Sequence, residues 1–528
     1  MIRVRQIKIP IEKDTMKELK EKVAKKLQVK SDQIEKIKIN KRSLDARNKE
    51  QIYYVYEVDI QIQKEEKILN KTKPDILKTP NETYQLEITG TKQAEDITIV
   101  GSGPAGLFCA YLLAENGYHP IIIERGEKVE ERVKTIEKFW ETGILNKDSN
   151  VQFGEGGAGT FSDGKLNTLT KDKNFRNKKV FQILVENGAP KEIMYENNPH
   201  IGTDILQQVV KNIRNKIINM GGTIKYHSKL TNLEIKNGKL EAIEVNSKER
   251  IPCHILVLAI GHSARDTFEM LLEKGLKMSP KSFAVGVRIE HPQRQINEAQ
   301  YGKKYKDILP PANYKLTYTT KEKRGVYSFC MCPGGYVVNA SSEEQRLVVN
   351  GMSNYQRESK NANSALVVTV TPKDYGENIL DGMAFQRNLE AAAYQEGQGK
   401  IPIQQYKDFK ENKKSTNLGE VTPTTKGMYT LANLNNILPT YIADSLKEAI
   451  PHFSKKIKDF GREDAILLGV ESRTSSPIKI LRDEQGISNI KGIYPCGEGA
   501  GYAGGITTSA IDGIKVAEWI AKRYLPTK

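Results

Sequence analysis

The stretch that decides the fold is Ile97-Thr-Ile-Val-Gly-Ser-Gly-Pro-Ala-Gly106. Three of its first four residues are apolar and predict a short buried strand, and three glycines follow at the spacing of a dinucleotide-binding turn. Gly101 allows the tight turn, Gly103 lets the backbone approach a pyrophosphate, and Gly106 lets the next helix pack closely on the strand. We therefore expect the whole turn to bind a dinucleotide cofactor through Gly101, Ser102, Gly103, Pro104, Ala105 and Gly106.

A helix should follow this turn. Pro104 suits the first helical turn, where its missing N–H is no loss. The helix N-terminus then presents unpaired N–H groups and a partial positive charge to the phosphates. A second strand, residues 120–123, ends in Glu124, eighteen residues after Gly106. A carboxylate there can accept hydrogen bonds from both ribose hydroxyls, and we expect Glu124 and Arg125 to contact the cofactor.

A glycine-rich segment near the C-terminus indicates that the cofactor is FAD. Residues 492–497 predict a strand that ends at Gly497-Glu498, and a helix begins about ten residues later. This arrangement resembles the second FAD-binding segment of glutathione-reductase-type flavoproteins, in which the acid binds the ribityl chain and the helix N-terminus points at flavin N1 and O2. Glutamate stands here in place of the more usual aspartate. The resemblance implies cofactor contacts at Gly497, Glu498, Gly504, Gly505, Ile506 and Thr507.

Residues 153–164 are also rich in glycine, and Gly156 and Gly157 are expected beside the flat isoalloxazine ring. The alternative is a mobile surface loop, because glycine-rich loops are common without ligands. Gly261, which follows an apolar strand from Ile255, resembles the turn at which such sheets leave the FAD domain. Leu230 is expected opposite the adenine.

Longer strings make the chain similar to a family of largely uncharacterised bacterial FAD-dependent dehydrogenases within the glutathione-reductase superfamily. The resemblance covers most of the chain, and it implies FAD but no particular substrate. It rests on residues 150–165, 199–204, 283–291, 361–364 and 496–505, on Phe329-Cys-Met-Cys-Pro-Gly-Gly335 and on Glu471-Ser-Arg-Thr-Ser-Ser-Pro477.

The predicted fold class is α/β, with a small α+β module before an FAD-binding Rossmann-like domain of the glutathione-reductase type. At 528 residues the chain is too long for one core. We expect a basic module at 1–85 and an FAD-binding domain at 95–278 with a helical excursion at 127–198. A β-rich substrate or cap domain should span 279–460, and 461–528 should return to the FAD domain.

Composition narrows the class of protein. The sequence lacks a run of about eighteen apolar residues, so we expect no membrane-spanning helix. Its five cysteines are scattered and do not form a disulfide framework. A cytoplasmic location is therefore expected. Residues 1–80 hold 21 Lys and Arg against 13 Asp and Glu. Because most are lysines interleaved with glutamates and no aromatic stacking motif accompanies them, we do not expect nucleic-acid binding.

Candidate catalytic residues are fewer. Arg473 lies among hydroxyl residues and could anchor an anionic substrate or flavin O2. Cys330 and Cys332 could add redox chemistry. A disulfide between residues two apart would be strained and therefore easily reduced. The alternative is that the two side chains are simply packed. His200, His262 and His291 are candidate acid–base groups, and Asn361 and Asn363 could line the cap. No metal-ligand spacing is present.

The sequence thus predicts an FAD-dependent oxidoreductase that acts on a small substrate by hydride transfer at flavin N5. We expect no separate NAD(P)H-binding domain, so NAD(P)H or another redox partner would dock only transiently. Two alternatives stay open: an RNA-associated flavoprotein that uses the basic module, and a binding protein that holds FAD without turnover. The sequence predicts no oligomeric state.

Overall fold

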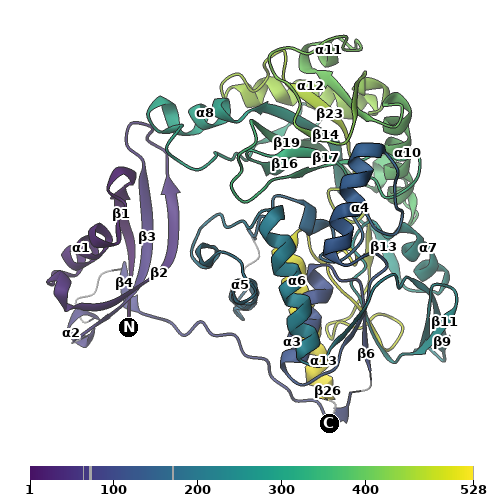
Figure 1. Cartoon of the computed structure of the whole chain (residues 1–528), viewed down its shortest axis with the longest axis horizontal. Helices are drawn as coiled ribbons and strands as arrows, with labels where there is room; N and C mark the ends of the chain where they lie inside the picture. Colours follow the sequence, from purple (N-terminus) through teal and green to yellow (C-terminus); the bar gives the residue numbers. More distant parts are fainter. Residues whose placement is uncertain (64, 70–73, 95, 169–171, 527–528) are drawn as a thin grey trace.

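The computed structural model describes residues 1–63, 65–69, 74–94, 96–168 and 172–526. An N-terminal sheet stands to one side, and an extended segment joins it to the larger body (Figure 1). In the described residues, no helix combines the length and apolar character needed to cross a membrane.

The N-terminal sheet has four strands in the order β2-β3-β1-β4. Thr15 caps its helix, because Thr15 Oγ1 accepts a hydrogen bond from the Glu18 N–H at 3.1 Å. Leu19, Val23 and Leu27 form the buried stripe, while Met16 is exposed. The elements are β1 (Ile2–Pro10), α1 (Met16–Leu27), β2 (Ile34–Asp45), β3 (Tyr53–Ile62), α2 (Glu65–Leu69) and β4 (Ile76–Lys78).

A parallel five-stranded sheet, in the order β25-β12-β6-β7-β8, forms the centre of the larger body. The predicted strand before the glycine turn is confirmed as β6 (Ile97–Val100). Ile97 and Ile99 face one hydrophobic core and Val100 the other, as strand alternation requires. The other strands are β7 (Ile121–Ile123), β8 (Thr223–Lys225), β12 (Ile255–Leu258) and β25 (Ile493–Pro495).

Helices cover one face of this sheet and a small antiparallel sheet covers the other. The helical side holds α3 (Pro104–Glu115), α5 (Arg176–Glu186), α6 (Thr203–Asn219) and α13 (Ile506–Arg523), with α4 (Val129–Thr142) above them (Figure 1). The opposite side holds β9 (Leu230–Lys236), β10 (Lys239–Val245), β11 (Glu249–Pro252) and α7 (Arg265–Glu273). This three-layer arrangement is a Rossmann-like α/β domain.

The extended segment after β4 crosses to the far end of the larger body. There β5 (Lys92–Gln93) pairs in parallel with β26 (Tyr524–Leu525), beside the C-terminus. Gly90 lies against the backbone of Tyr524, where a Cβ atom would come within 2.4 Å. The segment is therefore packed against the chain end rather than looped into solvent.

A second large sheet carries the cap, in the order β15-β16-β19-β14-β23-β20-β22, with a three-stranded sheet β18-β17-β21 beside it. Its strands are β14 (Phe283–Pro292), β15 (Thr317–Thr319), β16 (Gly325–Cys332), β17 (Tyr336–Asn339), β18 (Val349–Met352), β19 (Asn361–Val370), β20 (Ile401–Gln405), β21 (Thr425–Lys426), β22 (Tyr429–Leu431) and β23 (Ile466–Glu471). Its helices are α8 (Gln293–Tyr305), α9 (Pro372–Tyr375), α10 (Asp381–Glu396), α11 (Tyr406–Lys410) and α12 (Thr440–Ser454).

The cap is an insertion between two parts of the parallel sheet. The chain leaves through β13 (Met278–Pro280) and returns through β24 (Ile478–Ile480), and these two strands pair with each other. β23 lies beyond the expected boundary at residue 460, yet it is a central strand of the cap sheet, bonded to β14 and β20. Figure 1 shows the cap sheet above the ends of the parallel strands.

Candidate functional site

A cavity of about 380 Å³ lies where the turns after β6, β7 and β12 meet the cap. This volume is within the usual range for small-molecule sites. Its lining includes most of the predicted cofactor residues: Gly101, Gly103, Pro104, Ala105, Glu124, Arg125, Gly157, Leu230, Gly261, Glu498, Gly504, Gly505, Ile506 and Thr507. Four others stand outside the lining and support it from behind: Ser102, Gly106, Gly156 and Gly497.

The first glycine turn is sterically fixed. Gly101 has φ +97°, and a Cβ atom there would lie 2.4 Å from the Ala259 carbonyl oxygen. A Cβ atom on Gly106 would lie 2.0 Å from the Gly101 carbonyl oxygen. The prediction that Gly106 allows close helix packing is therefore confirmed, and its role is packing rather than lining.

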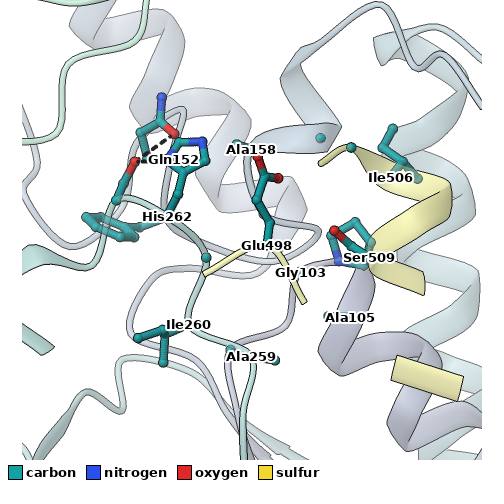
Figure 2. Close-up of a pocket in the computed structure, with 18 of the residues that line it drawn as sticks. Gly103, Ala105, Gln152, Ala158, Ala259, Ile260, His262, Glu498, Ile506 and Ser509 are labelled. Carbon is teal, nitrogen blue, oxygen red and sulfur yellow. Dashed lines mark hydrogen bonds between the residues drawn. The ribbon is translucent and has the colours of Figure 1, made fainter. Parts of the chain in front are cut away.

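Two helix N-termini open onto this one cavity. Helix α3 begins after Gly103 and helix α13 after Gly505, and neither has a side-chain cap. Figure 2 places Gly103 and Ala105 of the first turn, and Ile506 and Ser509 of α13, around the same pocket. Uncapped N–H groups and the helix dipole favour negative charge at both points. The site can therefore hold a ligand with two separated electron-rich groups.

The cavity also contains glycines whose missing side chains leave open space. A Cβ atom added to Gly261, Gly504 or Gly505 would meet nothing within 4 Å. All three residues line the cavity. Backbone that is bare and faces unfilled space is what close approach of a cofactor requires. These residues fit FAD.

Glu124 is buried, and protein donors already surround its carboxylate. One oxygen accepts from the N–H and Oγ of Ser102 at 2.9 and 2.8 Å, and the other from the N–H groups of Gly126 and Gly154 at 2.9 and 3.0 Å. A carboxylate has about four acceptor positions. Glu124 therefore fixes the two turns, and a ribose hydroxyl can bind it only by displacing a donor.

Arg125 closes the same end of the cavity. Its guanidinium lies 2.9 Å from both Asp148 Oδ1 and Asp266 Oδ2 and sits 4.2 Å from the centroid of the Phe153 ring. Leu230 is buried in the adjoining wall. At this end of the cavity, Leu230 therefore contributes apolar surface and Arg125 contributes a charged group.

The glycine-rich segment 153–164 is not a mobile surface loop, because most of it is buried. The fully buried Arg132 holds it by donating to carbonyl oxygens of Asn150, Val151, Gly154, Glu155 and Gly157 at 2.7–3.3 Å. A Cβ atom on Gly156 would lie 2.0 Å from Thr160 Oγ1. Sequence reasoning missed Arg132, since a single arginine on a helix carries no motif.

Glu498 reaches into the cavity near the start of α13 (Figure 2). Burial raises the pKa of its carboxyl group to about 7, although the nearby Gly505 N–H and Lys281 oppose the shift. A carboxyl group with this pKa can hold or release a proton near neutral pH.

The cap contributes a wall of different chemistry. Its cavity-lining residues are Phe329, Cys330, Asn350, Glu471, Arg473 and Thr474. Behind them the fully buried Arg288 donates to Glu471 Oε2 at 2.9 Å, Asn350 Oδ1 at 3.1 Å and the Cys330 carbonyl oxygen at 3.1 Å. Burial raises the pKa of Glu471 to about 7 in spite of Arg288.

Arg473 lines the cavity but is not the free anion anchor that we expected. Its guanidinium donates to both oxygens of Glu390 at 2.9 and 2.7 Å and to Ser342 Oγ at 2.6 Å. Arg265, at the start of α7, also binds both oxygens of Glu390, at 2.8 and 2.9 Å. Arg473 thus joins the cap to the Rossmann-like domain through a shared buried carboxylate.

The three histidines separate in space. His262 lines the cavity, and burial, aided by Arg473, lowers its pKa to about 3. His200 stands outside the lining, stacks on Tyr355 and contacts its carbonyl oxygen at 3.0 Å, with its pKa lowered by burial. His291 is buried in the cap beside Phe460. Burial also lowers the pKa of His291, to about 4, so the environment of each of the three histidines disfavours the charged form.

The asparagines Asn361 and Asn363 also stand outside the cavity lining. Asn361 Nδ2 donates to the Thr422 carbonyl oxygen at 2.8 Å, and Asn363 Oδ1 accepts from Arg288 at 2.8 Å. Both therefore support the cap from within. Within the described parts of the chain, no cluster of three or more His, Cys, Asp or Glu side chains could hold a metal ion.

Lys165 also lines the cavity, although no sequence motif predicts a role for it. Its Nζ lies 3.2 Å from Asp163 Oδ2, in a geometry without a hydrogen bond, and finds no acceptor among the described residues. Asp163 is held separately by Arg357, whose guanidinium donates to its two oxygens at 3.1 and 2.6 Å. Lys165 therefore brings an ammonium group with unused donors to the cavity.

Comparisons with known proteins agree with this geometry. Residues 282–474 match a family described as "FAD-dependent protein, C-terminal domain-like", and residues 99–149 match an NAD(P)-binding Rossmann-like domain. Residues 1–61 match a domain of unknown function. FAD is the cofactor.

Among solved structures, L-proline dehydrogenase from P. horikoshii is 15% identical, with a TM-score of 0.34, and covers 83% of this chain and 96% of its own. Glycine oxidase from Bacillus cereus is 12% identical, with a TM-score of 0.29, and the match covers 81% of this chain and 95% of the glycine oxidase chain. At such TM-scores neither structure indicates a substrate for this chain.

An uncharacterised protein of Clostridium beijerinckii is 49% identical over 532 residues, which is 99% of each chain. Similarity at this level along the whole length is that of members of one family. The chain therefore belongs to the same family as the Clostridium beijerinckii protein, a family of FAD-dependent proteins.

Proposed function

We propose that the chain is an enzyme that oxidises or reduces a small molecule between FAD and the cap, in a layout of the glutathione-reductase type. The observation that carries this proposal is the single cavity with two uncapped helix N-termini on one side and a wall of cap side chains on the other. A structural cofactor has no need of a polar wall from a second sheet.

The proposed orientation of the cofactor follows from the two helix ends. The start of α3 suits the pyrophosphate, because Gly103 leaves its N–H groups accessible. Leu230 and Arg125 then lie on the adenine side. The start of α13, with Gly504 and Gly505, suits the electron-rich edge of the flavin. Bound FAD supplies hydride transfer at its N5 atom.

The chain's own residues have three proposed tasks. Arg132 holds the glycine-rich segment over the cavity and so keeps water from that side. Glu498 can hold or release a proton beside the start of α13, given its raised pKa. Lys165 and the cap wall bind and orient the substrate.

The role of Glu124 needs revision within this proposal. Of its four donors, only Ser102 Oγ can leave without stranding a backbone N–H group. We propose that a ribose hydroxyl takes the place of Ser102 Oγ on Glu124. The other three bonds then keep the turn in shape.

An NAD(P)H donor stays a proposal, because both glycine strings that lie between a strand and a helix, residues 101–106 and 499–504, border the one cofactor cavity. The test is anaerobic: the yellow purified protein is mixed with NADH, NADPH or a metabolite panel, and flavin absorbance is followed. A compound that bleaches the flavin identifies the reductant or substrate. Flavin that light reduces but no tested acceptor reoxidises would instead indicate a binding protein. Protein that stays colourless after incubation with FAD would overturn the proposal.

A further inference from the structure

The cap wall presents a pair of cysteines to the cofactor cavity. Of the five cysteines, Cys330 alone is not buried, and it lines the cavity next to the exposed ring of Phe329. Cys332 is buried directly behind it. A small molecule that reaches this side of the cavity therefore meets one thiol first and a second thiol after it.

The backbone at Cys330 is held in an unfavourable conformation. Its φ is +43°, in the left-handed region, and the pairing of β16 with β19 shifts register between Phe329 and Cys332. Such a conformation costs about 1–3 kcal/mol and persists where neighbours enforce it. Here the Cys330 carbonyl oxygen accepts from Arg288 at 3.1 Å and from the Cys332 thiol at 3.3 Å.

The Cys332 thiol lies beside Cys330, since it donates to the Cys330 carbonyl oxygen at 3.3 Å. Residues two apart have Cα atoms within about 7 Å, the outer limit for a disulfide. A bridge here is therefore feasible but strained, which makes it easy to reduce.

Charges around the pair favour a thiolate at Cys330. The Cys332 hydrogen bond, followed by the charges of Arg288 and Lys165, lowers the pKa of Cys330 to about 5 against burial and Asp163. Glu471 and Glu498 also face Cys330, and both oppose the thiolate. The same hydrogen bond and burial raise the pKa of Cys332. Partial exposure with nearby cations is the environment of reactive cysteines.

We infer that Cys330 and Cys332 form a reactive dithiol that exchanges with a small disulfide entering the cap side of the cavity. The Cys330 thiolate attacks one sulfur of R–S–S–R′, the S–S bond breaks, and R′–S⁻ leaves and takes a proton from water. Cys332 then loses its proton to water and attacks Cys330 Sγ, which releases R–S⁻. The small disulfide gains two electrons, and the cysteines lose them in forming their bridge.

This inference rests on the proposed function only for its location beside FAD, and it is tested without turnover. The purified protein with its bound flavin is treated with bis(2-hydroxyethyl) disulfide and digested with a protease. The mass of the peptide that contains both cysteines is then measured by mass spectrometry. The wild type should lose two hydrogen atoms from that peptide. Cys332→Ser should instead retain one mercaptoethanol group on Cys330, and Cys330→Ser should show neither change. Cys109→Ser, a buried control, should behave as wild type.

Alkylation of the unmutated protein gives a second readout that no folding defect can disturb. Between pH 6 and pH 8 an ordinary thiol with a pKa of about 8.5 becomes roughly 80-fold more reactive. Cys330 should change by less than about twofold, because it is already a thiolate. Lys165→Met should shift this profile to higher pH.

An ordinary rising profile for Cys330, or Cys332→Ser protein that captures no mercaptoethanol, overturns the inference. FAD content is measured on the same samples. If the protein is yellow and its cysteines do not react, the dithiol inference is wrong and the flavoenzyme proposal still stands. If the protein is colourless and the two cysteines do react, the flavoenzyme proposal is wrong and the dithiol inference still stands.

Discussion

The two walls of the cavity use different chemical groups: backbone on the Rossmann-like side and side chains on the cap side. The Rossmann-like wall uses backbone: bare glycines and two helix ends without side-chain caps. The cap wall uses side chains, among them Cys330, Glu471 and Arg473, each held by a buried partner. Backbone can recognise a cofactor that never changes, whereas a particular substrate needs particular side chains.

The two walls are joined by a buried ionic cluster, and its loss should give the largest effect. Glu390→Gln leaves Arg265 and Arg473 buried without their shared carboxylate. We expect the free energy of unfolding to fall by about 3–5 kcal/mol, measured by denaturant titration. Glu344→Gln is the control, because its ion pair with Lys147 is exposed and is worth about 1 kcal/mol or less.

The same cluster predicts a pH dependence. The two arginines lower the pKa of Glu390 below its ordinary value of 4.5. Its stabilisation is therefore present above about pH 4.5 and is lost as pH falls through the lowered pKa. The stabilities of wild type and Glu390→Gln should approach each other below that pH, and a constant difference would contradict this assignment.

Glycines of the backbone wall should divide into two kinds. Gly106→Ala places a Cβ atom against backbone, so we expect a loss of about 1–3 kcal/mol in unfolding free energy together with weaker FAD binding. Gly504→Ala points into open space, so the FAD-free protein should keep its melting temperature while FAD affinity falls. Unchanged FAD affinity in Gly504→Ala would show that the cofactor lies elsewhere.

Glu498 is an exception to this contrast, because it is an acidic side chain that lines the cavity on the Rossmann-like side. Its folded-state pKa of about 7 lies above its ordinary value of 4.5. Its contribution to the stability of the FAD-free protein is thus full below about pH 4.5 and lost as pH rises through 7. The melting temperature of Glu498→Gln should rise relative to that of the wild type between about pH 4.5 and pH 7 and stay higher by a constant amount above pH 7. Parallel curves would place the pKa near its ordinary value.

Ser102→Ala should have the smallest effect. It removes one hydrogen bond to Glu124, which is worth about 1 kcal/mol. If a ribose hydroxyl replaces Ser102 Oγ, FAD affinity should stay equal or rise slightly while stability falls. A clear loss of affinity, measured by fluorescence titration of FAD, would show that Ser102 itself binds the cofactor.

Local sequence patterns predicted the backbone wall closely. The strand before Gly101, the helix that begins at Pro104 and the helix that begins at Ile506 all formed as expected. Each depends on contacts within a few residues, or on a steric rule that only glycine satisfies. The open alternative for residues 153–164 depended on burial and on Arg132 of α4, which donates to the carbonyl oxygens of Gly154, Glu155 and Gly157.

The cap wall depended on partners distant in sequence. Arg473 was expected to anchor an anionic substrate or flavin O2, and it binds Glu390 of α10, 83 residues away. Lys165 meets the cap only in the folded chain, and Cys330 gains its surroundings from Arg288.

The sequence by itself determined the Rossmann-like domain, its glycine turns and the class of cofactor, because turn geometry and helix ends are local properties. Tertiary structure alone decided which charged groups are paired, which cysteine faces the cavity and which acids have raised pKa values. These properties depend on burial and on electrostatic partners, and both exist only once the cap sheet packs over the parallel strands.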